Sequence, residues 1–437
     1  MKRFPLYLSF ILASVFLFSA CVDGINEDPN RPSEVPTKAL ITAAQKQLVG
    51  NLRSQGASLD GSMLFVQYYS KNTYTDGSRY SLQGFKDNGY WGNLYQTLNN
   101  LEEVIKLNTN AATKDKVVLE NMGRNATQIA VSRILKAYAF YALTDVLGDV
   151  PYQSYGKTDT DFEALQQAPQ NLIPRYAPQE KIYVDILNEL QAAGDTLIKY
   201  KTESTFPIGD IIYAGNNEKW AKFANSFRLR IAMHLKAKNN VVYVQHFEDA
   251  LAKGVFVSNA DNAVFNYSNT APNEAPLYRA TVTQNRKDYA VSHIFVNLLQ
   301  GTLGTVNAVD PRLPIFALPN KQGLYVGLPY GLDKDVAGNF KVDDVSLPGS
   351  VVNAANFGEV LMEYSEVLFL ISEHKGWSEG EYRAGVEASL DKWGVSSADK
   401  LGYLDKLPAV SKENVLNQKY IALFTQGLEA WSEYRRT

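Results

Sequence analysis

The side chains that most often carry catalysis or bind metals are scarce in this chain. It has four histidines, His234, His246, His293 and His374, and one cysteine in 437 residues. No HExxH motif, GxSxG elbow, phosphate-binding loop or GxGxxG motif is present. The 46 acidic residues leave a glycosidase pair of carboxylates open, because such a pair is set by distance in space and not by spacing in sequence. The sequence therefore predicts no metal and no cofactor, and it gives little support to an enzyme.

The single cysteine, Cys21, lies where an apolar run gives way to polar sequence. Two basic residues precede the uncharged run at 6–18, and small residues stand directly before the cysteine. This order is typical of a bacterial lipoprotein signal, although Phe18 replaces the usual aliphatic residue. Lipidation of the thiol would hold the protein on a membrane. We expect a signal peptide at 1–20 and a flexible acidic tether at 21–36; the alternative is a signal cleaved elsewhere, with the cysteine as an ordinary apolar residue.

The rest of the chain has the composition of a large globular protein. Hydrophobic residues make up 45% and charged residues 20%, and loss of Lys2 and Arg3 with the signal changes the net charge from −3 to −5. A mildly acidic chain without a basic cluster argues against nucleic acid as a partner, since neutralisation of phosphates dominates that binding. No stretch after the signal is long and apolar enough to span a bilayer.

Tyrosine is unusually abundant, with 26 residues, and several tyrosines fall in loops beside polar side chains. Sugars present flat C–H faces that stack on aromatic rings, and their hydroxyls need amide, carboxylate or guanidinium partners. Each tyrosine could instead cover a local hydrophobic cluster. The candidate ligand-binding residues are Tyr74, Arg79, Tyr80, Asn273, Tyr278, Arg279, Tyr325 and Tyr330.

Apolar residues at three- and four-residue spacing predict amphipathic helices through most of the chain. Consecutive helix pairs predict an all-α fold, an α-solenoid of tetratricopeptide-like pairs, in one domain at 37–437. The helical scaffold is expected at about 37–253 and 357–437, and weak periodicity at about 255–355 predicts an irregular, loop-rich lobe. Expected helices include Thr37–Leu52, Ser58–Tyr69, Ile129–Leu147, Pro178–Tyr200, Asn217–Ala237, Asp288–Gln300, Phe357–Gly376 and Asn414–Arg435.

Several phrases occur together in an order that is informative although each is only a helix-packing pattern. They include "WGNLYQTLNNLEEVI" (91–105), "LTDVLGDVPY" (143–152), "WAKFANSFRLRIAM" (220–233), "DPRLPIF" (310–316), "EYSEVLFLISEHKGW" (363–377) and "QKYIALFTQGLEAWSEYRRT" (418–437). With the lipoprotein signal, they resemble the SusD/RagB-like nutrient-binding outer-membrane lipoproteins of Bacteroidota. The resemblance departs at His374, where a small residue is usual, and the family phrase continues beyond Thr437, so a further segment is expected there.

The resemblance implies a helical body with four tetratricopeptide-like pairs and a loop-rich ligand lobe. It implies an outer-membrane lipoprotein facing the cell exterior, whose partner is a SusC-like TonB-dependent transporter and whose ligand is an oligosaccharide or a peptide. The acidic residues after Cys21 resemble the surface-export signal of such proteins. Ligand residues of the family do not lie in the shared phrases, so the tyrosine candidates rest on composition alone. The alternatives are a lipid-anchored glycan hydrolase and a helical-repeat scaffold that binds another protein.

Overall fold

A computed structural model describes residues 35–82, 85, 88–120, 122–166 and 172–437. The expected signal peptide, Cys21 and most of the tether lie outside these residues. Within them, no helix combines the length and the apolar character needed to cross a membrane.

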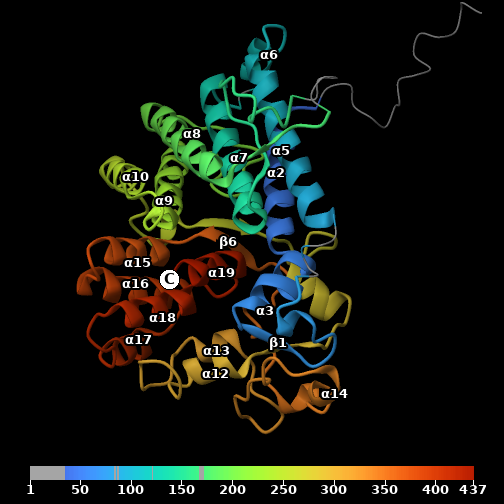
Figure 1. Ribbon diagram of the computed structural model, residues 1–437, viewed down its shortest axis with the longest axis vertical. Coiled ribbons are helices and arrows are strands. Elements are labelled where there is room, and N and C mark those ends of the chain that lie inside the picture. Colours follow the sequence, from blue (N-terminus) through green and yellow to red (C-terminus); the bar gives the residue numbers. More distant parts are fainter. Residues whose placement is uncertain (1–34, 83–84, 86–87, 121, 167–171) are drawn as a thin grey trace, which may run out of the picture.

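The first helical body is a row in which each long helix packs against the next in chain order (Figure 1). A short helix, α6 (Lys114–Leu119), caps the end of the molecule opposite the loop-rich lobe. The row consists of α2 (Thr37–Leu52), α5 (Asn88–Thr109), α7 (Asn125–Leu147), α8 (Gln179–Lys199), α9 (Asn217–Leu235) and α10 (Asn240–Lys253).

Helix α7 is central to this row because it carries apolar side chains on nearly every side. It packs against both α5 and α8, and side chains such as Ile134, Leu135 and Phe140 are at most 1% exposed. A helix that is apolar all round is stable only when it is covered on several faces. It ends at Gly148, whose φ of +80° lies in the region that favours glycine.

A second helical body follows the loop-rich lobe. Its first helix packs against α9, which joins the two bodies. The body consists of α15 (Tyr364–His374), α16 (Glu379–Lys392), α17 (Ser397–Leu404), α18 (Lys412–Ala422) and α19 (Gly427–Arg436).

The loop-rich lobe is built from short elements around its own aromatic core (bottom of Figure 1). Its buried "DPRLPIF" turn is held by Arg312, which donates to Asp310 at 2.6 Å and to Ser389 at 2.8 Å. Its elements are α11 (Pro276–Tyr278), η5 (Arg279–Thr283), β5 (Tyr289–Val291), α12 (His293–Leu299), α13 (Leu313–Phe316), α14 (Lys334–Ala337) and η6 (Val342–Asp344). Before them, η4 (Asn259–Asp261) and β4 (Ala263–Asn266) pack against the helical bodies, and Phe265 lies in the core of the first body.

Among the described residues, three two-stranded antiparallel pairs tie separate segments together. An early segment joins the lobe: η1 (Gln55–Ser62), α3 (Met63–Phe65), β1 (Tyr69–Lys71) and η2 (Gly77–Arg79). Strand β1 pairs with β5, and β4 pairs with β6 (Gly358–Met362). The third pair joins β2 (Val150–Pro151) to β3 (Tyr176–Ala177).

The last helix of the second body, α19, contacts both the first body and the early segment that joins the lobe. Leu428 packs against the core of the first body, while the Trp431 ring lies 5.2 Å from that of Phe65. At its start the backbone comes so close to η1 and α3 that a Cβ on Gly427 would lie 2.8 Å from the Ser62 hydroxyl and 2.9 Å from the Met63 nitrogen. Helix α19 therefore connects the helical scaffold to the segment that borders the lobe.

The helical scaffold with a loop-rich lobe is as predicted, but four of the expected helices are wrong in detail. Residues 58–69 form a π-helical turn, a short helix and the start of a strand, and residues 288–300 contain β5 before α12. Residues 357–376 begin with β6, because this apolar run pairs with a strand about a hundred residues away. The last expected helix is two helices, since Thr425 adopts a φ of +78° that breaks it.

Candidate functional site

The loop-rich lobe contains a cleft of about 1040 Å³ beside β1, which we name the Tyr74 cleft. Strands β1 and β5 pair so that Lys71 lies opposite Tyr289, although the two are far apart in the sequence. The turn after β1 and the turn before β5 then face the same space. The residues that define the cleft include Gln55, Asp60, Lys71, Tyr74, Arg286 and Asp288.

Charged groups in the Tyr74 cleft hold one another in place. The Lys71 ammonium is buried and lies 2.7 Å from Asp60 Oδ1 and 3.0 Å from Asp288 Oδ2. Arg286 donates to both oxygens of Asp288, at 3.0 and 2.6 Å. Burial opposes ionisation of Asp288, but the hydrogen bond from Arg286 and the charge of Lys71 outweigh it and lower the pKa of this carboxyl. These polar groups therefore keep fixed positions.

Two neutral side chains also donate hydrogen bonds to the Asp60 carboxylate. The Tyr289 hydroxyl donates to Oδ1 at 2.8 Å, and the Gln55 amide donates to Oδ2 at 2.9 Å. Gln55 begins the π-helix η1, in which Gly61 has a non-helical backbone (φ −124°, ψ −108°). Such wide turns are frequent at functional sites.

Tyr74 presents its ring above these charges. Its side chain is 72% exposed, and its ring centroid lies 5.5 Å from the Lys71 ammonium and 5.9 Å from the Arg286 guanidinium. Its φ of +56° is uncommon for a bulky residue, and Asn285, on the facing turn, has a φ of +52°. Backbone strain of this kind clusters at ligand-binding sites. A flat apolar ring next to fixed hydrogen-bonding groups is an arrangement that can hold a sugar.

Three more of the predicted ligand-binding residues lie near this cleft: Arg79, Tyr80 and Tyr330. The ring of Tyr80, 55% exposed, lies 6.0 Å from that of Tyr330, whose hydroxyl donates to a backbone carbonyl. Arg79 forms an exposed ion pair with Asp76, at 2.5 Å. The structure therefore brings Tyr80 and Tyr330 together, with Tyr74 in the cleft beside them.

The predicted residues of the lobe lie elsewhere. Arg279 borders a second cavity of about 560 Å³, which we name the Arg279 groove. Asn273 lies next to this groove, because its side-chain oxygen accepts a hydrogen bond from Lys46, which borders the cavity. Tyr278 is half-buried in α11, and Tyr325 is half-buried against the aromatic core of the lobe. Neither of these two tyrosines borders either cavity among the described residues.

Sequence reasoning missed most of the polar residues of the Tyr74 cleft. Asp60, Lys71, Arg286 and Asp288 carry no motif, and their meeting depends on pairing between strands separated by more than two hundred residues. The stretch "NRKDYAV" (285–291) carries a local signal for a short strand, because polar residues there precede a run rich in strand-forming residues.

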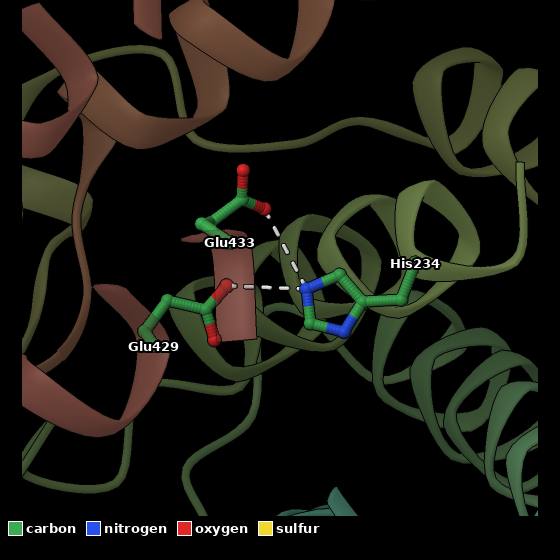
Figure 2. Close-up of side chains that lie close together, drawn as sticks. All are labelled: His234, Glu429 and Glu433. Carbon is green, nitrogen blue, oxygen red and sulfur yellow. Dashed lines mark ion pairs between the residues drawn. The ribbon is translucent and has the colours of Figure 1, made fainter. Parts of the chain in front are cut away.

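In the described part of the chain, one group of three side chains of the types that bind metals lies together, outside the Tyr74 cleft. Figure 2 shows His234 of α9 pointing between Glu429 and Glu433 of α19, with its Nε2 3.4 and 3.5 Å from their carboxylate oxygens. Burial disfavours the charged imidazole, but hydrogen bonds and charges of the two carboxylates raise its pKa to about 9. Lys419 also lies 2.9 Å from Glu433. Cations of the protein therefore neutralise these carboxylates, and the cluster fastens α19 to the scaffold.

Other histidines are also held by neighbours. His293 Nδ1 accepts the backbone N–H of Tyr330 at 3.1 Å, and the imidazole of His374 lies between the Tyr243 hydroxyl and the Glu248 carboxylate, 2.6 Å from each. The unusual His374 of the sequence therefore links α15 to α10.

Comparison with known proteins places this fold. The family model for SusD-like proteins, described as "Starch-binding associating with outer membrane", matches residues 29–437. The chain belongs to the SusD-like family. Members of this family are binding proteins without catalytic activity, which confirms the expectation that the chain is not an enzyme. A search of the curated proteins finds no match.

Solved structures of SusD-like proteins share the fold over nearly the whole chain. A chitin-binding protein has 25% sequence identity and a TM-score of 0.73, covering 92% of this chain and 87% of its own. A chitin-binding SusD homologue from Flavobacterium johnsoniae has 24% identity and a TM-score of 0.71, covering 91% and 86%. A SusD homologue from Parabacteroides distasonis has 21% identity and a TM-score of 0.72, covering 92% and 85%.

Proposed function

We propose that this protein is a lipid-anchored receptor on the outer face of the outer membrane that captures an oligosaccharide in the Tyr74 cleft. The single observation that carries this proposal is the exposed Tyr74 ring above a fixed set of carboxylates and cations. A sugar unit stacked on the ring would exchange hydrogen bonds with these groups. The family description, which names starch and the outer membrane, supports the glycan class and the location.

The charges of the Tyr74 cleft favour a neutral ligand. Its carboxylates are matched by cations, and the central ones are already paired with one another. A hydroxyl can donate to the carboxylates and accept from the cations without breaking these pairs. Oligomers of N-acetylglucosamine are suitable first probes, because two of the similar solved structures are described as chitin-binding.

The proposal extends to anchoring and transport. Residues 1–20 are the signal peptide, Cys21 carries the lipid, residues 21–36 form the tether, and the single domain at 37–437 covers a SusC-like TonB-dependent transporter to which it delivers the ligand. Replacement of the cysteine by serine is expected to move the protein from the membrane fraction to the supernatant of lysed cells. Co-purification of an outer-membrane barrel with the wild-type protein would test the partner.

Calorimetry with chitohexaose tests the ligand site. We expect the Tyr74→Ala variant to bind about 2 to 12 times more weakly, the range for losing one ring contact of about 0.5–1.5 kcal/mol. Tyr434→Ala is the matched control, since Tyr434 is similarly exposed (75%) but lies on α19 and does not border the cleft. Equal affinity of the two variants, or no binding of neutral oligosaccharides by the intact protein, would contradict the proposal.

A further inference from the structure

The Arg279 groove adjoins the Tyr74 cleft. Gln55, the first residue of η1, borders both cavities, and the groove extends from it between α2 and the turn of η5. With about 560 Å³ beside the 1040 Å³ of the cleft, the two together have room for several sugar units. A chain bound on Tyr74 would therefore reach the groove in one direction.

Two cations of the Arg279 groove have no acidic partner. Lys46 donates to the side-chain oxygen of Asn273, and Arg279 donates to the backbone carbonyl of Pro272 at 2.5 Å. In the described ranges, no carboxylate oxygen lies within 4 Å of either cation. Of the cations of the Tyr74 cleft, Lys71 and Arg286 differ, because each lies within 3.0 Å of a carboxylate, whereas the exposed Lys287 has no ion pair among the described residues.

The other side chains that border the groove leave its net charge positive. Glu274 is its one acidic residue among those described, and it is only 8% exposed and accepts from the Thr283 hydroxyl at 3.4 Å. The hydroxyl of Tyr267, which also borders the groove, is buried and lacks a hydrogen-bond partner in the described part of the chain. Two cations thus border the space, against one carboxylate that is largely covered.

We propose that the Arg279 groove is a subsite for a singly charged acidic sugar, with a uronic-acid carboxylate received by Lys46 and Arg279. An arginine fork and a lysine ammonium both bind a carboxylate by charge-assisted hydrogen bonds, and one net positive charge matches one carboxylate. The inference rests on the proposed function: a neutral unit stacks on Tyr74, and the acidic unit lies beyond Gln55. The captured glycan then alternates or mixes neutral and acidic residues.

A matched pair of ligands separates the two sites. Chitohexaose contains only N-acetylglucosamine, whereas a hyaluronan hexasaccharide alternates it with glucuronic acid. We expect the wild-type protein to bind the hyaluronan hexasaccharide more tightly, with an affinity that falls as salt is raised. The double variant Lys46→Gln/Arg279→Gln is expected to lose about tenfold or more of that affinity, the effect of a lost charge-assisted hydrogen bond, while chitohexaose changes less than about twofold.

A second variant blocks the groove without removing a charge. Gly50 lies in α2 on the wall of the groove, and a Cβ there would make an ordinary contact of 3.7 Å with the Tyr267 hydroxyl. Helix α2 therefore accepts a Cβ at this position, and the longer side chain of Gly50→Leu is designed to occupy the groove. We expect this variant to lose the preference for hyaluronan and to keep binding chitohexaose.

The outcomes distinguish the inference from the proposed function. If the wild-type protein binds chitohexaose at least as tightly as hyaluronan, or if neither groove variant alters hyaluronan binding, the acidic subsite is overturned while capture in the Tyr74 cleft stands. If Tyr74→Ala leaves both affinities unchanged, or if neither hexasaccharide binds, the proposed function is overturned and the acidic subsite with it.

Discussion

His234 should make the stability of the protein depend on alkaline pH. Its pKa is about 9 in the folded protein, against 6.5 in an unfolded chain, because Glu429 and Glu433 hold the charged imidazole. A difference of about 2.5 pKa units corresponds to about 3 kcal/mol. Since the folded pKa is the higher one, this contribution is fully present below pH 6.5 and is lost as the pH rises through 9.

The expected shift is measurable as a melting temperature. For roughly 400 residues, an unfolding entropy of about 2.1 cal/mol/K per residue converts 3 kcal/mol into about 4 °C. Thermal denaturation of wild-type protein and His234→Gln would be followed by circular dichroism from pH 6 to 9.5. We expect the wild-type advantage over the variant to shrink by about 4 °C across this range.

His246→Gln provides the matched control. Burial, together with the neighbouring Arg228, lowers the pKa of His246 to about 4, so this imidazole is neutral throughout the range. Above about pH 7.5 the imidazole is neutral in the unfolded chain as well, so from pH 7.5 to 9.5 the melting temperature of the control should follow the pH dependence of the wild-type protein. A constant difference between wild type and His234→Gln from pH 6 to 9.5 would refute the charged imidazole and the ion pairs assigned to it.

Three further outcomes follow from buried groups and backbone geometry. Arg230→Met leaves the buried Glu366 carboxylate, 2.5 Å from the guanidinium, without its counter-ion, and urea denaturation should show a loss of about 3–5 kcal/mol; a loss below 1 kcal/mol would contradict this. Gly209→Ala should cost about 1–3 kcal/mol because its φ is +109°, whereas Gly402→Ala on α17, with no atom near its Cβ, should be neutral or stabilising in the same assay. Between pH 6.5 and 4 the wild-type protein should lose stability relative to His246→Gln, since a folded pKa below the unfolded one favours the neutral imidazole; parallel melting curves would argue against it.

The helices could be predicted from the sequence because their signal is local. The apolar faces of α8 and α9 repeat every three or four residues, and those helices begin and end within two residues of the expected positions. Strand β6 could not be predicted in this way. Its run of Val360, Leu361 and Met362 fits a helix equally well, and only pairing with a distant strand decides its conformation.

The candidate site was predictable only in part, for the same reason. Tyr74 was found because loop composition is visible in the sequence, and Arg279 because an arginine beside tyrosine and asparagine fits a ligand surface. Lys71 and Asp288 were not found, since an isolated lysine and an isolated aspartate have no meaning until strands β1 and β5 meet. Tyr325 fits the same compositional pattern as Tyr74, yet its ring packs against the aromatic core of the lobe.

The position of α19 has a consequence for the order in which the protein folds during synthesis. This helix follows every other described element in the chain, so it leaves the ribosome after them, yet it supports η1 and α3 next to the Tyr74 cleft. The nascent polypeptide can assemble its earlier helices without acquiring a finished binding surface. Loss of the residues from Gly427 onward would remove the contacts of α19 with η1 and α3, so the shape of the Tyr74 cleft depends on this carboxyl-terminal segment.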